Sequence, residues 1–126
     1  MYYDLLPKIK NAVRVQKDKL IVPFSRMDLA VATALVNGGY LKSVEKETAG
    51  KRSILVMRLA YKDKKSVVTD FTTISKPSRH RYIDYRSLRP VKQGHGLGVV
   101  STSKGIMNDK EARKNKLGGE YLFEIW

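Results

Sequence analysis

Three consecutive short hydroxyl side chains, Ser101, Thr102 and Ser103, form the most distinctive chemical pattern in this sequence. They end an apolar run and are followed by Lys104 and Gly105. Hydroxyl groups donate and accept hydrogen bonds, and they are small enough to enter the wide, shallow minor groove of A-form RNA. The pattern therefore predicts a contact with an RNA helix, with a plain serine-rich turn as the alternative.

Basic side chains gather upstream of the hydroxyl run, and tyrosines alternate with them. Tyr82 and Tyr85 supply rings that can stack on an exposed base or sugar while neighbouring cations bind phosphates. Seven basic residues lie from residue 76 to residue 104 against one acid, Asp84: Lys76, Arg79, Arg81, Arg86, Arg89, Lys92 and Lys104. A solvated strand pair with inward tyrosines is the alternative. Nucleic-acid binding is favoured because only alternate positions of a strand can be buried.

Catalytic patterns are weak by comparison. The two histidines, His80 and His95, are too few and too far apart for a metal site or a catalytic triad. The glycine run Gly94–Gly98 lacks the spacing and context of a dinucleotide-binding loop, and residues 103–105 do not fit a phosphate-binding loop. We therefore expect no enzyme activity, no cofactor, no metal and no small-molecule substrate.

The composition favours a polyanionic partner. The chain of 126 residues carries 25 Lys+Arg against 12 Asp+Glu, which gives a formal charge of +13, and it has no cysteine. Such an excess repels itself in a folded protein, and nucleic acid is the usual partner that relieves it. No run reaches the roughly 18 apolar residues of a membrane span, and the N-terminus lacks a secretory signal. These features predict a soluble cytoplasmic protein, and a basic protein without an RNA partner is the alternative.

The first half of the chain predicts an α-β-α-β-β unit. The four-residue recurrence of Leu5, Ile9 and Val13 indicates the first helix, and Ser25 starts the second. The predicted buried stripe of the second helix is Met27, Leu29, Ala32, Leu35 and Val36. In chain order the predicted elements are a helix over 2–16, a strand over 20–22, a helix from 25 to the glycines at 38–39, and strands over 40–47 and 53–61.

The second half predicts mostly strands. They cover residues 67–75, 81–85 and 121–126, with a turn over 76–79 and a helix from residue 108 or 109 to 116 that Gly118 and Gly119 end. The predicted fold class is therefore α+β in two small lobes, residues 1–65 and 66–126. The first lobe is α-β-α-β-β, and the second is mostly β with a short helix.

Several of these segments resemble the small-subunit ribosomal protein S-eight family (universal small-subunit protein eight), bacterial type. Residues 101–107, 112–113 and 117–120 resemble its C-terminal signature, 74–77 with 79–82 its hairpin, and 4–6, 9–12 and 23–26 its first two helices. The matches follow the family order along nearly the whole chain. Three positions depart from the family pattern, because His95 stands where Leu is usual, Gly98 where Ala is usual and Ser78 where Gly is usual.

The resemblance implies a structural constituent of the small ribosomal subunit, located in the cytoplasmic ribosome. It also implies primary binding to the central domain of 16S rRNA and a role in subunit assembly. The implied rRNA-binding residues of the second lobe are Ser101, Thr102, Ser103, Lys104, Gly105, Lys76, Pro77, Arg79, Tyr82, Arg86, Gly118, Gly119 and Glu120. Those of the first lobe are Lys8, Asn11, Arg14, Ser25 and Arg26, facing a second rRNA segment. The implied protein partners are neighbouring small-subunit proteins, including protein five, and some family members also bind their own operon messenger RNA.

Two other functions fit part of the pattern. A regulatory module that binds messenger RNA or DNA, such as a translational repressor, would share the basic surface and would bind duplex DNA comparably. A nucleotide-using enzyme built on the glycine run would need a catalytic pair or metal cluster, which the sequence does not supply.

Overall fold

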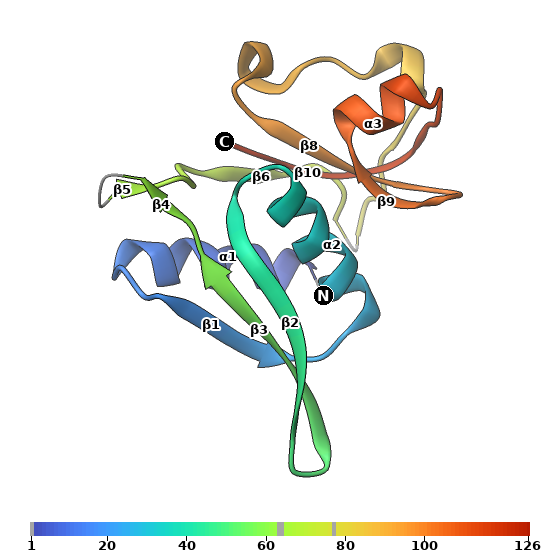
Figure 1. The fold of residues 1–126 in the computed structure, drawn as a ribbon. Coiled ribbons are helices and arrows are strands. Elements are labelled where there is room, and N and C mark those ends of the chain that lie inside the picture. Colours follow the sequence, from blue (N-terminus) through green and yellow to red (C-terminus); the bar gives the residue numbers. More distant parts are fainter. Residues whose placement is uncertain (1, 63–64, 77) are drawn as a thin grey trace. The chain divides into compact units, whose positions relative to one another are not determined.

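The chain folds as two compact α+β units, Met1–Thr69 and Asp70–Trp126, in a computed structural model that describes residues 2–62, 65–76 and 78–126 (Figure 1). The predicted α+β class, with a helix-strand-helix start and a mostly β second half, is confirmed. The lobe boundary predicted between residues 65 and 66 stays a prediction.

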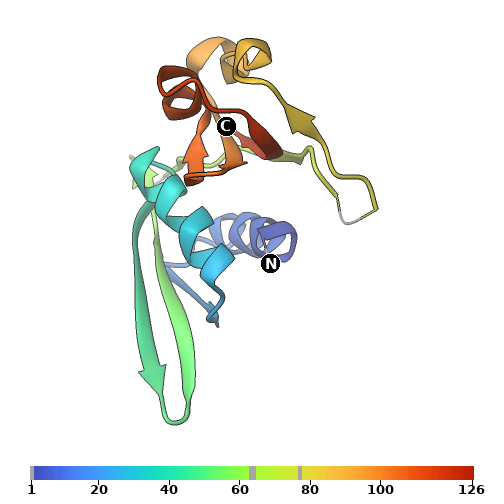
Figure 2. The ribbon, with the colours of Figure 1, turned by 90° about the vertical axis from the view of Figure 1, so that its right-hand side faces the viewer.

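The N-terminal unit is a three-stranded antiparallel sheet with two helices on one of its faces, as Figure 2 shows. The strand order is β1-β3-β2, and the two long strands form a hairpin whose turn is at Gly50 and Lys51. The elements are α1 (Tyr2–Arg14), β1 (Lys19–Pro23), α2 (Arg26–Asn37), β2 (Leu41–Ala49) and β3 (Arg52–Leu59). All five correspond to predicted elements, with ends shifted by a few residues.

Helix ends in this unit are set by residues in the left-handed backbone region. Gln16 has a φ of 57°, and the next amide, of Lys17, donates to the carbonyl of Ala12, which closes α1 two residues before its predicted end. Gly39, with a φ of 85°, ends α2 in the same way through the amide of Tyr40 and the carbonyl of Leu35. The predicted glycine stop of α2 is confirmed.

The start of α2 is also confirmed, but its predicted buried stripe is partly wrong. The Ser25 side chain accepts a hydrogen bond from the Asp28 amide at 3.5 Å, as an N-cap does. Ala32 and Leu35 are fully buried as predicted, together with Val31. The other three predicted positions are only half-buried, because they flank the stripe rather than lie at its centre: Met27, Leu29 and Val36.

The second strand of the hairpin buries the predicted face. Leu55, Met57 and Leu59 are each at most 4% exposed, as expected for the face of the sheet that the two helices cover. Tyr61, predicted to continue this face, instead belongs to a separate two-residue strand, β4 (Tyr61–Lys62), which pairs with β5 (Lys65–Ser66).

The C-terminal unit is a five-stranded antiparallel sheet built around the last strand. The strand order is β6-β10-β8-β9, and β7 also pairs with β10. Its elements are β6 (Phe71–Thr73), β7 (Tyr82–Ile83), β8 (Leu97–Thr102), β9 (Gly105–Asn108), α3 (Asp109–Lys114), β10 (Gly119–Ile125) and two 3-10 turns, η1 (Tyr85–Ser87) and η2 (Val91–Gly94).

The structure of this unit differs from the expectations at four elements. The strand predicted over 67–75 shrinks to β6 and that over 81–85 to β7, because each pairs with only a short stretch of β10. The strand β9 was not predicted, since Gly105–Asn108 is too short and mixed to show a period. Finally, α3 is closed by Lys116, with a φ of 56°, and not by the glycines at 118–119.

Candidate nucleic-acid interface

The hydroxyl run forms the turn of a β-hairpin. Ser101 and Thr102 end β8, Ser103 and Lys104 make the turn, and Gly105 begins β9 with a φ of 114°. The Thr102 hydroxyl donates to the Gly105 carbonyl at 2.8 Å and accepts from the Lys104 amide at 3.2 Å. The Thr102 side chain therefore holds the turn, while the side chains of Ser103 and Lys104 are exposed at its tip.

Strand register brings three predicted site residues into one row. Glu120 of β10 lies opposite Tyr82 of β7 on one side and opposite Ser101 of β8 on the other. Residues directly opposite in antiparallel strands share a face of the sheet. Tyr82 is 76% exposed, and one strand, β10, separates it from the strand that carries the hydroxyls.

The carboxylate of Glu120 ties this row to the segment before β7. It accepts hydrogen bonds from the buried Ser75 hydroxyl and from Nδ1 of His80, the latter at 2.8 Å. Partial burial alone would raise the pKa of Glu120, but these two hydrogen bonds and the nearby His80 lower it below its ordinary value. Since the Ser75 hydroxyl also accepts from the Arg81 amide at 3.2 Å, the loop between residues 75 and 81 is held at both ends.

That loop is a tight turn that carries cations. The backbones of Lys76 and Arg79 exchange two hydrogen bonds of 3.0 Å, which confirms the predicted turn, although Pro77 lies outside the described residues. Lys76, Arg79 and Arg81 line one cleft of about 310 Å³ together with Thr73 and Ile74. Arg81 was among the seven cations noted in this part of the sequence, but not among the residues that the family resemblance implied.

Two glycines let the strands of this surface approach each other. A Cβ at Gly118 would lie 2.5 Å from the Ile83 carbonyl oxygen, and one at Gly119 would lie even closer to the carbonyl oxygen of Ser101. Both predicted residues therefore shape the surface by leaving room for the neighbouring backbones.

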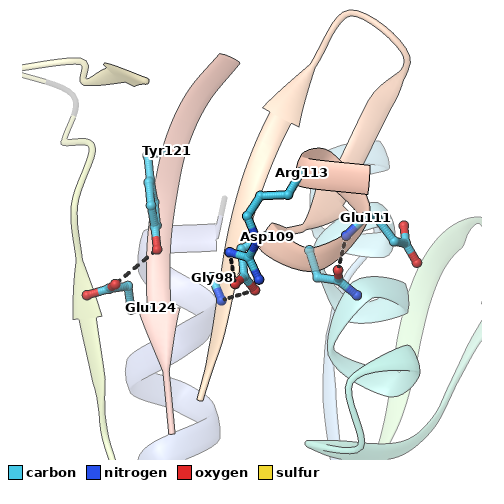
Figure 3. A network of polar contacts seen from close by, with 7 residues as sticks. Gly98, Asp109, Glu111, Arg113, Tyr121 and Glu124 are labelled. Carbon is cyan, nitrogen blue, oxygen red and sulfur yellow. Dashed lines mark hydrogen bonds and ion pairs between the residues drawn. The ribbon is translucent and has the colours of Figure 1, made fainter. Parts of the chain in front are cut away.

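Helix α3 fixes the strand that carries the hydroxyls, as Figure 3 shows. The buried carboxylate of Asp109 accepts from the Gly98 amide at 3.1 Å and from the Arg113 guanidinium at 2.8 Å. The Asn108 side chain accepts from the Glu111 amide at 2.8 Å, so it caps the helix as predicted. The start of α3 is thus bonded to β8 a few residues before the hydroxyl turn.

The departure at Gly98 has a steric reason. A Cβ at this position would collide with the hydroxyl of Tyr121, which donates to Glu124 at 2.9 Å (Figure 3). Burial, followed by the Glu124 carboxylate, raises the pKa of the Tyr121 hydroxyl above its ordinary value. Glycine at position 98 therefore makes room for a tyrosine at position 121.

The remaining predicted residues of this unit divide between surface and core. Arg86 is exposed on η1, where its Nε donates to the Tyr85 hydroxyl at 3.3 Å. Tyr85 itself is half-buried and packs against the cluster around Leu88, Val100 and Tyr121. That cluster covers part of the Tyr85 ring, and stacking of the ring on RNA stays a prediction.

In the N-terminal unit, the predicted residues lie on the helices. Lys8, Asn11 and Arg14 are exposed on α1, and Arg26 is exposed at the start of α2. Lys8 and Ser25 line one cleft of about 260 Å³, which Asp4 and Asp28 also line. These carboxylates make the cleft less favourable for phosphate than the C-terminal cation cleft.

Other kinds of site find little support in the described residues. Among residues 2–62, 65–76 and 78–126, no three histidine or acidic side chains gather as metal ligands. Within the same ranges, each helix is too short or too polar to cross a bilayer.

Comparison with known proteins agrees with this geometry. The family model described as Ribosomal protein S8 matches residues 2–126. "Small ribosomal subunit protein uS8" of Microcystis aeruginosa (strain NIES-843 / IAM M-2473) is 40% identical over 125 residues, and that of Anaeromyxobacter sp. (strain Fw109-5) is 36% identical over 124 residues. Each alignment covers 98% of this chain and 94% of the relative. "Small ribosomal subunit protein uS8c" of Welwitschia mirabilis is 37% identical over 123 residues, with 98% of this chain and 96% of the relative covered. The chain therefore belongs to the ribosomal protein S8 family and is a structural protein of the small ribosomal subunit.

Proposed function

We propose that this protein is a primary rRNA-binding protein that docks on the central domain of 16S rRNA and supports assembly of the small subunit. The observation that carries the proposal is the exposed turn of Ser103 and Lys104, in a sheet that also presents the exposed Tyr82. The protein recognises the rRNA by complementary shape and charge and catalyses no reaction.

The hydroxyl turn enters the minor groove of an rRNA helix. A turn of two residues is narrow, and its short side chains reach 2′-hydroxyls and base edges that a long cation would miss. Because Thr102 uses its hydroxyl to hold the turn, Ser103 makes the direct contacts and Lys104 meets the adjacent phosphates.

The rest of the surface orients the RNA. The cations of the 76–81 loop bind backbone phosphates, and the Tyr82 ring stacks on a base or sugar. Arg86 adds a further phosphate contact, and the glycines at 118–119 allow the close approach of the backbones that form this surface. The exposed polar face of α1 and the start of α2 meet a second rRNA segment. Protein five as a neighbour and the operon messenger RNA as a second ligand stay predictions.

The test is a filter-binding titration with a central-domain rRNA fragment. Ser103→Ala removes one hydrogen-bonding group from the complex, which costs about 1 kcal/mol, or roughly a fivefold loss of affinity. Ser87→Ala removes another exposed hydroxyl of the same unit and should leave affinity unchanged. Equal affinities for Ser103→Ala and the parent chain would contradict the proposed contact.

Two further conditions separate RNA recognition from general polyanion binding. Affinity should fall steeply as salt rises, because each neutralised phosphate releases counterions. Duplex DNA of the same sequence should compete poorly, because its minor groove is narrow and lacks 2′-hydroxyls. Comparable competition by DNA would favour a general nucleic-acid-binding module instead.

A further inference from the structure

The three-stranded sheet of the N-terminal unit has a second face that points away from α1 and α2 (Figure 2). Strand register assigns nine residues to this outer face, in three rows across the sheet. The rows are Lys19, Arg58 and Ser43; Ile21, Val56 and Glu45; and Pro23, Ile54 and Glu47.

The centre of the outer face is apolar and partly open. Ile21 is 52% exposed, Pro23 is exposed and Ile54 is half-buried around Val56, which is 7% exposed. The exposed Ile21 and Pro23 therefore adjoin the half-buried Ile54, and a contiguous apolar patch with a polar rim is typical of a contact surface. Aliphatic groups offer an RNA phosphate neither a hydrogen bond nor an opposite charge, so this part of the face does not suit an RNA backbone.

The charges of the outer face differ from those of the whole chain. Lys19 and Arg58 balance Glu45 and Glu47, all four exposed, so the face is neutral in a protein of formal charge +13. Both carboxylates lie along β2, at one edge of the sheet. Two carboxylates side by side on one strand repel an RNA backbone and attract basic side chains.

We propose that the outer face of this sheet is a docking surface for a basic protein of the small subunit, with the apolar centre buried and Glu45 and Glu47 paired with lysine or arginine of the partner. The proposal needs only that the chain resides in the small subunit, and it is independent of the proposed rRNA contacts. Nine residues are fewer than the roughly 20 to 30 that a stable interface uses on each side, so the contact forms when rRNA holds both proteins in place.

Photo-crosslinking in assembled small subunits tests this assignment. A benzophenone amino acid replaces Ile21 in the full chain, and the same amino acid replaces Ser103 in a second version. After irradiation, we expect position 21 to join a basic ribosomal protein and position 103 to join rRNA. An adduct of position 21 with rRNA or with a second copy of this chain, or no adduct at all, would overturn the inference.

Charge reversal tests the role of the carboxylates. In the position-21 version, Glu45→Lys should lower the yield of the protein adduct by about two- to tenfold, because it replaces an attraction at the interface by a repulsion. Glu111→Lys makes the same change of charge at an exposed position of α3 and should leave the yield unchanged. Equal yields for the two variants would argue against the acidic edge. Because position 103 reports rRNA separately, failure of this inference is distinguishable from failure of the proposed function.

Discussion

The buried carboxylate of Asp109 should be a main source of stability in the C-terminal unit, and Asp109→Ala tests this. Its side chain is 3% exposed and accepts from the Gly98 amide and from Arg113. Removing it leaves a buried amide without its acceptor, which costs about 1 to 3 kcal/mol. The lost ion pair adds about 0.5 kcal/mol, and the lost negative charge at the helix start adds about 0.3 to 1 kcal/mol. We expect the free energy of unfolding to fall by about 2 to 4.5 kcal/mol.

Urea unfolding of the full chain, followed by circular dichroism, measures this loss, and two milder variants separate its parts. Asp109→Asn keeps an acceptor for the Gly98 amide and loses only the charge, so a loss of about 1 kcal/mol is expected. Arg113→Ala removes a half-exposed partner and should cost about 0.5 kcal/mol. If Asp109→Ala is no more destabilising than Arg113→Ala, the link between α3 and β8 is not what holds this unit together.

Three further predictions concern the candidate interface. The pKa of Glu120 is lowered in the folded chain, so its carboxylate stabilises the fold above the unfolded pKa, and this contribution is lost as pH falls through the folded pKa. Glu120→Gln should therefore make stability depend less on pH on the acid side. Urea midpoints of the variant and the parent chain that change in parallel between about pH 6 and about pH 3 would refute this. Gly119→Ala should lower the free energy of unfolding by about 1 to 3 kcal/mol and weaken rRNA binding, because the added Cβ collides with the Ser101 carbonyl. An unchanged urea midpoint would show that the two strands can shift apart at no cost in stability. Tyr82→Ala should lower rRNA affinity by about 1 to 3 kcal/mol while Tyr82→Phe keeps it, and equal losses for the two would mean that the hydroxyl and not the ring makes the contact.

The N-terminal unit was largely predictable because its signals are local. The helix period of Leu5, Ile9 and Val13, the cap at Ser25 and the glycine stop at Gly39 all act within a few residues of the position they specify. The strands of the long hairpin are also neighbours in sequence. The errors here are at ends and flanks, where packing and not period decides burial.

The fold of the C-terminal unit depends on strand pairings for which the sequence carries no local signal. Its last strand, β10 (Gly119–Ile125), pairs with β6, β7 and β8, which all lie earlier in the chain. Short segments such as Tyr82–Ile83 are strands only because they pair with β10. Both β6 and β7 are too short to show a period of their own.

The sequence by itself determined the charge, the two helices and three long strands of the first unit, the family and the presence of a hydroxyl turn. Only the tertiary structure decided that Thr102 supports this turn while Ser103 and Lys104 are presented by it. It also decided that Glu120 lies between Tyr82 and Ser101. The physical reason is that charge and local period are properties of neighbouring residues, whereas strand register and the partner of a buried carboxylate are fixed by contacts between residues far apart in the chain.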